Sequence, residues 1–545
     1  MPRKSSISQA TARPPVPVVS SSDNTYAGAL LKLQVHEHDF SYTQPHGSGG
    51  SGASQPDAMA VGTAVLLGST DVRTWTHQKV NRHQRLALTN FHVVEDCGPS
   101  RLVRCVTPGG HRLSSATVVL ACPMLDFALV RLDVTDADAA LLGDGMVCIT
   151  DRLACPSVGQ PVTAVGFALD ASDLHWTTGA VTSSMGAHVA GFISHSASIA
   201  SGNSGGPCVS ADGRLAGLNT ATMVESDSIS LAVPLWCIRA AIAQNPEAAA
   251  AGGVLRPVTL GMATRPPQPF DGSPLGVRVT RVFDTCSVAG IRMGDHVTHV
   301  GDVAVGPMGR LVAPGGTAST CFSILLDPDD GRGDADVQGA LTVLALASPT
   351  TGTLAIRVRR GVHNLKLELD VSQAVLPDRG LAVARRYPFH EHMYSLRLGG
   401  VVLQPLTVGL LEAFDVDGQT RQERDVLACV DAALASNRGY QAVVVSHVAL
   451  TSCLHDHVEV LDRLVSVDGH PVHTLADVVA AAAIGGTGTA STGRRHSKRH
   501  RRKLTLEWAV DGPLECDRGV LAIESMPIPR STSAARVGGA TMISL

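Results

Sequence analysis

Short apolar runs separated by glycine, proline and aspartate make up much of the chain. The runs are rich in Val, Ala, Leu and Thr, and β-branched or small apolar residues in runs of this length are typical of strands. The pattern predicts β-rich barrels or sandwiches rather than helical bundles. In the first half, strands are predicted at 60–67, 85–90, 115–121, 127–132, 160–166, 178–183, 215–220 and 229–234.

The pattern changes at 246–253, a stretch rich in alanine and glycine that we expect to be a linker. Two further groups of strand-like runs follow it, and a helix is predicted at 475–483. The stretch 306–339, rich in glycine, proline and aspartate, is expected to be an inserted loop without a role of its own. The first group of runs lies at 258–262, 276–282, 289–297 and 354–361, and the second at 399–406, 442–448 and 460–472.

The composition is that of a multidomain globular protein. A chain of 545 residues is long enough for about three or four domains of roughly 150 residues each. Hydrophobic residues make up 44% of the chain and charged residues 17%, and the formal net charge is −4. This balance excludes a largely disordered chain and a chain that binds nucleic acid along its whole length.

The N-terminal stretch contains Arg3, Lys4 and Arg13 among Ser, Thr and Pro, with no acidic residue before Asp23. Such a composition fits a disordered tail or an organelle transit peptide. No apolar stretch approaches the roughly 20 residues needed to cross a bilayer, and no secretory signal is recognisable. We expect a soluble, intracellular protein without a membrane span, and its compartment stays open between mitochondrion, cytoplasm and nucleus.

Cysteine and histidine patterns give no metal site. The 12 cysteines form no Cys-x-x-Cys pair, and several lie inside apolar runs, so we expect mostly buried thiols. Histidines two residues apart occur at 36 and 38, 390 and 392, and 455 and 457, but they would need a strand and further ligands that the sequence does not identify. Neither a metal nor a cofactor is therefore expected.

Arginine and lysine dominate the run 494–503. Such a run binds phosphate backbones or an import receptor, or forms a solvated loop between strands. No aromatic residue interleaves with it, which disfavours a surface that stacks single-stranded bases. Contact with nucleic acid is therefore not expected outside this run.

The strongest chemical signal is the turn Gly202-Asn203-Ser204-Gly205-Gly206-Pro207. A seryl oxygen is a poor nucleophile unless a histidine takes its proton and a carboxylate orients that histidine. His92 follows the predicted strand 85–90, and Asp126 stands at the head of the apolar run 127–132. A carboxylate there is either a simple turn residue or is partnered by a donor such as an imidazole N–H.

Taken together, three motifs carry a resemblance to a known family. The serine turn is preceded by Thr-Asn-x-His-Val-Val around His92 and by Asp-x-Ala-Leu-Val-x-Leu from Asp126. This set resembles the HtrA/Deg family of trypsin-like serine proteases. The resemblance implies a mainly β chain with a chymotrypsin-like double β-barrel followed by two PDZ-like α+β domains.

The same resemblance implies roles for individual residues. Ser204 would be the nucleophile, His92 the general base and then acid, and Asp126 the group that fixes the imidazole tautomer. The oxyanion hole would be formed by Gly202, Asn203 and Ser204. Ile199 and the strand residues Ile229, Ser230, Leu231 and Ala232 match positions that line the primary specificity pocket and pair with substrate backbone, with a small or apolar residue preferred before the scissile bond. Leu260, Gly261 and Met262 would form the PDZ loop that binds a peptide carboxylate.

Two positions depart from the family pattern. Ser196 stands in a stretch where the family usually has an acid, and Phe91 stands where a small or polar residue usually precedes the histidine. Both departures bear on how the activation loops form the oxyanion hole. The second half of the chain looks most like plant-type Deg proteases with a second, divergent PDZ domain. Such proteases assemble from trimers, often through N-terminal aromatic residues, for which Phe40 and Tyr42 are candidates.

The sequence thus predicts a tail at 1–25, a protease domain at 26–247, a PDZ-like domain at 258–370 with the inserted loop, and a second at 385–530 with a basic insertion at 484–503. The predicted function is that of an ATP-independent serine endopeptidase that degrades unfolded or damaged proteins. Its PDZ units would capture peptide C-termini or internal segments, and the chain would form a homo-oligomer of one or more trimers. The alternative is a weakly proteolytic or inactive holdase or scaffold that binds client proteins.

Overall fold

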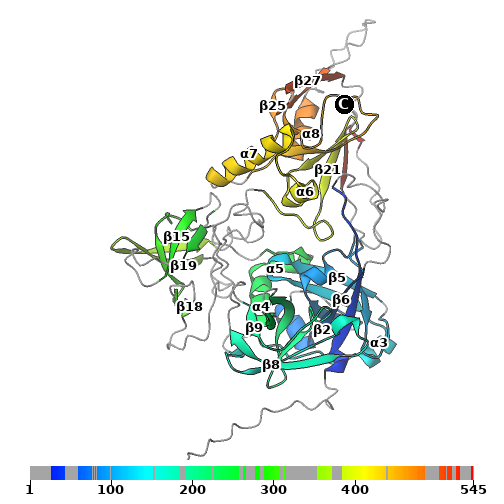
Figure 1. The fold of residues 1–545 in the computed structure, drawn as a ribbon, viewed down its shortest axis with the longest axis vertical. Helices are drawn as coiled ribbons and strands as arrows, with labels where there is room; N and C mark the ends of the chain where they lie inside the picture. The colour runs from blue at the N-terminus through cyan, green and yellow to red at the C-terminus, as the bar shows by residue number, and fades with distance from the viewer. Residues whose placement is uncertain are drawn as a thin grey trace, which may run out of the picture.

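Three folded units follow one another along the chain in the computed structural model, drawn in Figure 1. We call them the first unit (26–256), the second unit (262–370) and the third unit (383–543). The structure describes residues 26–42, 59–76, 78, 80–81, 83–98, 100–113, 115–150, 154–183, 192–223, 226–256, 262–265, 276–282, 286, 288–305, 311–312, 353–370, 383–436, 440–484, 503–510, 512–517, 523–527 and 542–543.

The first unit begins with a curled seven-stranded sheet in the order β13-β5-β6-β3-β2-β1-β4. Backbone hydrogen bonds from Val103 to Ala116 and from Val118 to Arg101 join the segment before β4 to β5, so the sheet wraps round on itself. Its strands are β1 (Leu30–His36), β2 (Met59–Leu66), β3 (Gln84–Thr89), β4 (Arg104–Val106), β5 (Ser115–Cys122), β6 (Phe127–Asp133) and β13 (Gly253–Val254).

A closed six-stranded barrel, β10-β11-β12-β9-β8-β7, completes the first unit. Its strands are β7 (Pro161–Gly166), β8 (His175–Ser183), β9 (Ile193–His195), β10 (Pro207–Ser210), β11 (Leu215–Met223) and β12 (Ser226–Pro234). The core shared by sheet and barrel is aliphatic, with fully buried side chains such as Leu33, Leu88, Leu129, Val165 and Leu218. Aliphatic side chains therefore make up most of this core, and Phe127 is also fully buried in it.

Helices in the first unit are short. They are η1 (Ala27–Ala29), α1 (Ser69–Trp75), α2 (Phe91–Val94), η2 (Pro123–Leu125), α3 (Asp136–Leu141), η4 (Ala168–Asp170), α4 (Leu235–Gln244) and α5 (Pro246–Ala251). The expectation of a linker at 246–253 is wrong, because α5 and β13 occupy it. Proline in the first turn and a run of alanines favour a helix, Gly252 ends it at φ +77°, and β13 then pairs in parallel with β5.

The second unit is a seven-stranded sheet in which β14, β15, β16, β17 and β18 follow one another and β19 pairs with both β16 and β20. Arg360 forms an ion pair of 2.7 Å with the buried Asp295, which fixes the turn before β16 to the end of β19. The strands are β14 (Met262–Arg265), β15 (Val277–Val282), β16 (His296–Val300), β17 (Val303–Val305), β18 (Leu311–Val312), β19 (Thr353–Arg360) and β20 (His363–Asp370).

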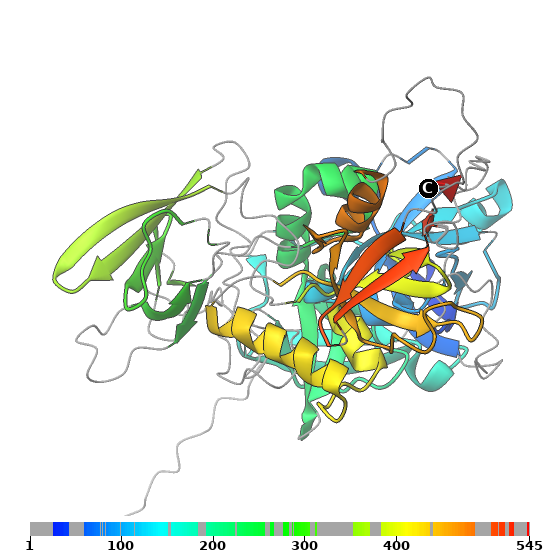
Figure 2. The same cartoon turned by 90° about the horizontal axis from the view of Figure 1, so that it is seen from above.

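Several residues singled out in the sequence lie at or beyond the limits of the described part of this unit. Leu260 and Gly261 lie outside the described residues, whereas Met262 is buried at the start of β14. Of the predicted loop 306–339, the described part is β18 alone, and it pairs with β17. Figures 1 and 2 both show the second unit to one side of the other two.

The third unit contains a nine-stranded sheet in the order β27-β26-β24-β23-β22-β21-β28-β29, with β25 paired to β24. The predicted helix at 475–483 is confirmed as α8 (Leu475–Ile484). The other elements are β21 (Tyr394–Leu398), β22 (Val401–Pro405), α6 (Val408–Ala413), α7 (Arg421–Ser436), β23 (Val443–Val448), β24 (Arg463–Val467), β25 (His470–Pro471), β26 (Lys503–Trp508), β27 (Gly512–Asp517), β28 (Ile523–Pro527) and β29 (Met542–Ile543). The basic run 494–503 lies outside the described residues except for Lys503, where β26 begins.

The predicted mainly β fold class is confirmed by these sheets. Of the cysteines expected inside apolar runs, Cys237 is buried and Cys148 and Cys429 are partly buried. No helix within the described residues is long and apolar enough to cross a membrane.

Candidate active site

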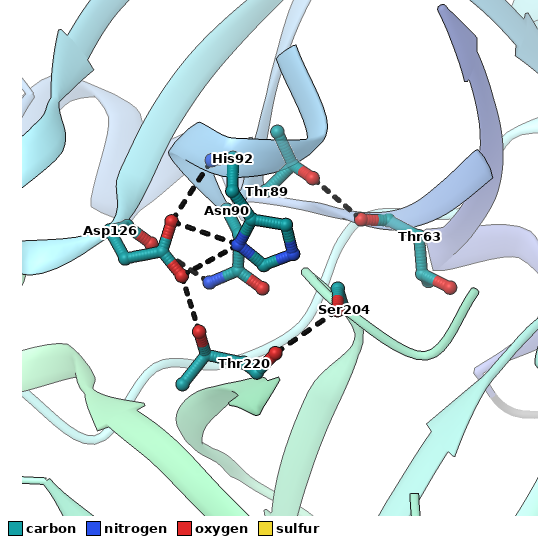
Figure 3. A network of polar contacts seen from close by, with 7 residues as sticks. All are labelled: Thr63, Thr89, Asn90, His92, Asp126, Ser204 and Thr220. Atoms are coloured by element: carbon teal, nitrogen blue, oxygen red, sulfur yellow. Dashed lines mark hydrogen bonds and ion pairs between the residues drawn. The ribbon is translucent and has the colours of Figure 1, made fainter. Parts of the chain in front are cut away.

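His92 and Asp126 lie side by side at one end of the curled sheet (Figure 3). β3 leads into the short helix α2, which presents His92 directly after the strand. The Nδ1 atom of His92 lies 2.9 Å from Oδ2 and 3.1 Å from Oδ1 of Asp126. The backbone N–H of His92 also donates to Oδ1 at 3.0 Å, so one carboxylate holds both the ring and the main chain of this residue.

Asp126 is both a turn residue and a partnered carboxylate. It follows η2 with a left-handed backbone (φ 48°, ψ 52°), and the side-chain amide of Asn90 donates to its carbonyl oxygen at 2.8 Å. Aspartate tolerates this conformation better than most residues. The turn therefore aims the carboxylate back at α2, which resolves the two alternatives that the sequence left open.

The pKa of His92 is raised above its ordinary value. Burial lowers it, but the hydrogen bond and charge of Asp126, together with the charge of Glu95, outweigh burial. Because an ionised carboxylate only accepts hydrogen bonds, Nδ1 of His92 carries a proton and Nε2 of the neutral ring is left as the acceptor. This is the tautomer that a general base requires.

Ser204 faces this imidazole from the closed barrel (Figure 3). Its hydroxyl donates to the carbonyl oxygen of Thr220 at 3.1 Å, and no hydrogen bond to His92 is recorded for it among the described residues. Rotation about one side-chain bond separates this position from one directed at the imidazole. In this arrangement the Ser204 hydroxyl is paired with a backbone carbonyl and not with the imidazole.

Thr220 contacts both Asp126 and Ser204, and sequence reasoning missed it. Its hydroxyl donates to Oδ2 of Asp126 while its carbonyl accepts from Ser204. It lies at an irregularity of β11, where the register with β12 shifts between Asn219 and Ala221. Such a bulge turns a backbone group away from the ladder. No sequence motif around Thr220 indicates that it contacts these two residues.

Thr63 on β2 holds the serine turn against the curled sheet, and sequence reasoning missed it too. Its hydroxyl donates to the Gly202 carbonyl at 2.7 Å and accepts from the Phe167 N–H at 3.1 Å. Its backbone N–H donates to the Ser204 carbonyl at 2.8 Å. One buried threonine thus fixes the carbonyl groups on both sides of Asn203.

The turn itself leaves two N–H groups available. Gly202 has φ +94°, and a Cβ atom there would collide with the Phe167 carbonyl. The Ser201 carbonyl is held by the Leu169 N–H at 2.6 Å, away from the serine. Within the described part of the chain, no hydrogen bond is recorded for the N–H groups of Gly202 and Ser204. These donors are the ones an oxyanion hole uses.

The loop that holds Ser201 is itself anchored. Leu169 and Asp170 adopt left-handed backbones with φ 55° and 60°. The ammonium group of Lys32 on β1 donates to the carbonyls of Asp170 and Ala171 at 2.8 and 3.2 Å, and it forms an ion pair with the Asp170 carboxylate. The left-handed backbone conformation at 169–170 is unfavourable for residues other than glycine, and contacts from Lys32 on the curled sheet help to maintain it.

The residues predicted to bind substrate divide into two groups. Ile199 and Ile229 are partly buried, whereas Ser230, Leu231 and Ala232 are buried in the barrel. β12 pairs with β11 on one edge and with β9 on the other along 230–232. These three residues therefore have no free edge with which to pair with a substrate, contrary to the expectation from the sequence.

Both departures from the family pattern have structural partners. The hydroxyl of Ser196 accepts from the Ala180 N–H at 3.0 Å and so ties the segment before the serine turn to β8. The ring of Phe91 is buried against Tyr387 and His390 of the third unit. Neither residue disturbs the contact between His92 and Asp126.

The aromatic residues considered for trimer contacts are engaged within the chain. Phe40 packs edge-on against Tyr42 at 4.8 Å and against Phe389 at 6.3 Å between ring centres. The side-chain amide of Gln404 donates to the Tyr42 carbonyl. The Phe40 ring thus contacts the third unit through Phe389, and Tyr42 packs against a hydrophobic cluster of the same unit.

The histidine pairs gather no metal site within the described ranges, where no group of three or more His, Cys, Asp and Glu side chains could hold an ion.

Comparisons with known proteins agree with this geometry. Residues 62–218 match the model of the trypsin-like peptidase domain. Over 219 residues the chain is 26% identical to the periplasmic serine endoprotease DegP of Salmonella typhimurium. This aligned stretch covers 38% of this chain and 40% of that protein. The chain therefore matches well under half the length of this relative.

Two solved structures are also similar. A serine endoprotease from Yersinia pestis has a TM-score of 0.39 and 18% identity, covering 65% of this chain and 98% of that one. The HtrA-type protease AlgW with a tripeptide has a TM-score of 0.41 and 17% identity, covering 65% and 96%.

The site described above thus lies largely within residues 62–218, the stretch that matches the trypsin-like peptidase domain, a class of domain found in serine-type endopeptidases. Within that class, the matched part of the chain is similar to the serine endoprotease DegP.

Proposed function

We propose that the chain is an ATP-independent serine endopeptidase that cleaves exposed segments of unfolded or damaged proteins. Ser204 is its nucleophile, His92 its general base and acid, and Asp126 the group that orients the imidazole. The observation that carries this proposal is that His92 Nδ1 is held by Asp126 while Nε2 stays an acceptor facing a serine turn.

The chemistry follows from the contacts of the resting site. The Ser204 hydroxyl leaves the Thr220 carbonyl, passes its proton to Nε2 of His92 and attacks the scissile carbonyl carbon. The Gly202 and Ser204 N–H groups stabilise the oxyanion, and one such donor contributes about 3 kcal/mol. His92 then protonates the leaving amine, and water hydrolyses the acyl-enzyme by the same route in reverse.

The other two units are proposed to capture substrates or to regulate assembly. Their sheets are compatible with PDZ-like domains, which bind extended peptides at a sheet edge. The Ile199 and Ile229 side chains would border a pocket for a small or apolar residue. Assembly into trimers or multiples of trimers is part of the same proposal, and the partly buried Phe40 and Tyr42 stay candidates for contacts between copies.

The test is cleavage of an unfolded protein such as casein by the wild type and by Ser204→Ala. Loss of the nucleophile removes a factor on the order of 10⁴ or more in turnover. Ser210→Ala, which alters a serine on β10, is the matched control and keeps wild-type turnover. Equal cleavage by wild type and Ser204→Ala would reject Ser204 as nucleophile.

A second candidate is a holdase or scaffold with weak or no proteolysis. The contact that favours it is the hydrogen bond from Ser204 to Thr220, because it leaves the hydroxyl unactivated at rest. Under this alternative, the wild type and Ser204→Ala suppress the aggregation of a client protein equally and neither cleaves casein.

A further inference from the structure

The helix that carries His92 is in direct contact with the third unit. Phe91, the residue before His92, has a side chain that is 4% exposed. Its ring lies edge-on against Tyr387, with ring centres 5.3 Å apart, and against His390, with centres 5.1 Å apart. Edge-on packing is an arrangement that aromatic rings prefer at such distances. The N-terminal end of α2 is thus fixed from outside the peptidase domain.

The opposite end of the same helix is held by His390. Its Nε2 atom lies 3.1 Å from the Val94 carbonyl and 2.9 Å from the Glu95 carbonyl. Burial and the charge of Arg101 lower the pKa of His390 to about 4, so the ring is neutral near pH 7. Because both carbonyls only accept, the proton sits on Nε2 and is shared between them.

The segment 385–391 that supplies these rings is itself locked to the first unit. The guanidinium of Arg256, just after β13, forms hydrogen bonds of 2.8 and 2.9 Å with the Glu391 carboxylate and of 3.1 Å with the Arg385 carbonyl. Glu391 also accepts from the Tyr387 N–H at 3.0 Å, which closes the segment into a compact turn. A partly buried, bidentate pair of this kind has a defined geometry.

The pKa of Glu391 fits its role as the acceptor that binds Arg256. Burial raises its pKa, but the hydrogen bond and charge of Arg256 outweigh burial and the pKa is lowered. The N-terminal arm adds a further contact, because the ring of Phe389 lies 6.3 Å from those of His38 and Phe40. Three parts of the chain that are distant in sequence therefore meet at 385–391.

We propose that segment 385–391 is a latch through which the third unit positions His92, with Phe91, Tyr387 and His390 as its positioning residues. α2 supplies both the His92 ring and the His92 N–H to Asp126, so a tilt of this short helix alters two hydrogen bonds of the triad at once. A partner that binds the third unit and displaces the latch would lower turnover without occupying the substrate site.

The latch also accounts for two features that the sequence left without a role. Phe91 departs from the family pattern because it is an aromatic contact for the third unit. The His-Glu-His run at 390–392 contains one residue that holds α2 and one that binds Arg256, rather than metal ligands.

The experiment compares Tyr387→Ala and His390→Ala with two conservative variants, Tyr387→Phe and His390→Gln, in the full-length protein. Tyr387→Phe keeps the ring that Phe91 touches, and His390→Gln keeps a side-chain N–H donor. The matched control is Tyr394→Ala, because Tyr394 is an aromatic residue of the same unit that is 56% exposed.

Two readouts are measured on each variant: hydrogen exchange of the amides at 90–97, and kcat and KM separately for a peptide substrate. We expect faster exchange at 90–97 and a fall in kcat of about 10- to 100-fold with unchanged KM for the alanine variants, since small misplacements of catalytic groups cost this much. The conservative variants recover most of the slow exchange at 90–97 and most of kcat. Tyr394→Ala matches the wild type in both readouts.

Unchanged exchange at 90–97 in both alanine variants overturns the latch, and so does faster exchange with unchanged kcat. If an alanine variant loosens the β22 and β23 strands as well, the conservative variants decide, because failure of both to restore kcat also overturns it. The catalytic readout rests on the proposed protease function, whereas the exchange readout does not. A wild type without turnover therefore rejects the function while leaving the latch to be tested by exchange.

Discussion

The hydroxyl of Ser204 donates to the carbonyl oxygen of Thr220 over 3.1 Å. The same threonine donates through its own hydroxyl to Asp126, so the two ends of the triad share one residue of β11. The serine is thereby kept close to the imidazole without being bonded to it. Any change at Thr220 therefore acts on Asp126 and Ser204 together.

Replacement Thr220→Val tests this bridge. It removes the hydroxyl from Asp126 and keeps the carbonyl that accepts from Ser204. A hydrogen bond to a charged group contributes about 1.5–3 kcal/mol, so kcat/KM is expected to fall about 10- to 100-fold in a peptide-cleavage assay. Thr298→Val, the same change at a partly buried residue of β16 in the second unit, is the control and leaves kcat/KM unchanged. Wild-type activity in Thr220→Val would contradict the bridge.

Gly202→Ala tests the shape of the oxyanion hole. The new Cβ atom collides with the Phe167 carbonyl in a left-handed backbone, so the turn has to move. Loss of one oxyanion donor lowers kcat by about 10²–10³. Gly159→Ala is a close control, because Gly159 also has a positive φ (+84°) but nothing within 4 Å of the added atom. Equal activity of these two variants would show that Gly202 does not shape the hole.

Activity should depend on pH through His92. The base works only when neutral, and its pKa is raised, so kcat/KM rises with pH and reaches half of its plateau above about pH 6.5, the ordinary value for histidine. Removing the charge of Glu95 with Glu95→Gln moves this midpoint to lower pH. Glu247→Gln, which alters an exposed acid on α5, should not move it. A midpoint that is unchanged or raised in Glu95→Gln would contradict the electrostatic account.

Thr63→Val tests how the curled sheet holds the serine turn. The variant loses the hydrogen bonds to Gly202 and Phe167 and leaves these buried groups without that partner. Each such loss costs about 1–3 kcal/mol, so both thermal stability and kcat should fall. Thr63→Ser keeps the hydroxyl and should restore kcat even if it remains less stable. Failure of Thr63→Ser to restore more activity than Thr63→Val would assign the effect to packing alone.

Much of the fold could be predicted from the sequence because strands leave a local signature. The strands β5, β6 and β7 lie within a residue or so of the predicted runs, and so does helix α8. Helix α7 was missed although Val426, Val430 and Ala433 repeat at helical spacing, because polar residues between them hide the apolar face. The composition of 246–253 predicts a linker where α5 forms, because alanine and glycine are common both in linkers and in short helices with a glycine end.

The site was predictable only where its residues belong to motifs. His92, Asp126 and Ser204 each stand in a recognisable run, and the structure brings His92 and Asp126 into contact. Thr63, Thr220 and His390 act through contacts with segments far away in the sequence. Which strand edge or loop lies beside the serine turn depends on how the whole chain is folded, and no local pattern contains that information.

The most direct test of the account is labelling with a serine-directed fluorophosphonate, followed by mass spectrometry of the modified peptide. Covalent labelling needs a nucleophilic hydroxyl, a working base and an oxyanion hole at the same time. We expect modification at Ser204 in the wild type, and its loss in Ser204→Ala and in His92→Ala. Modification at another serine, or no modification of the folded wild type, would contradict it.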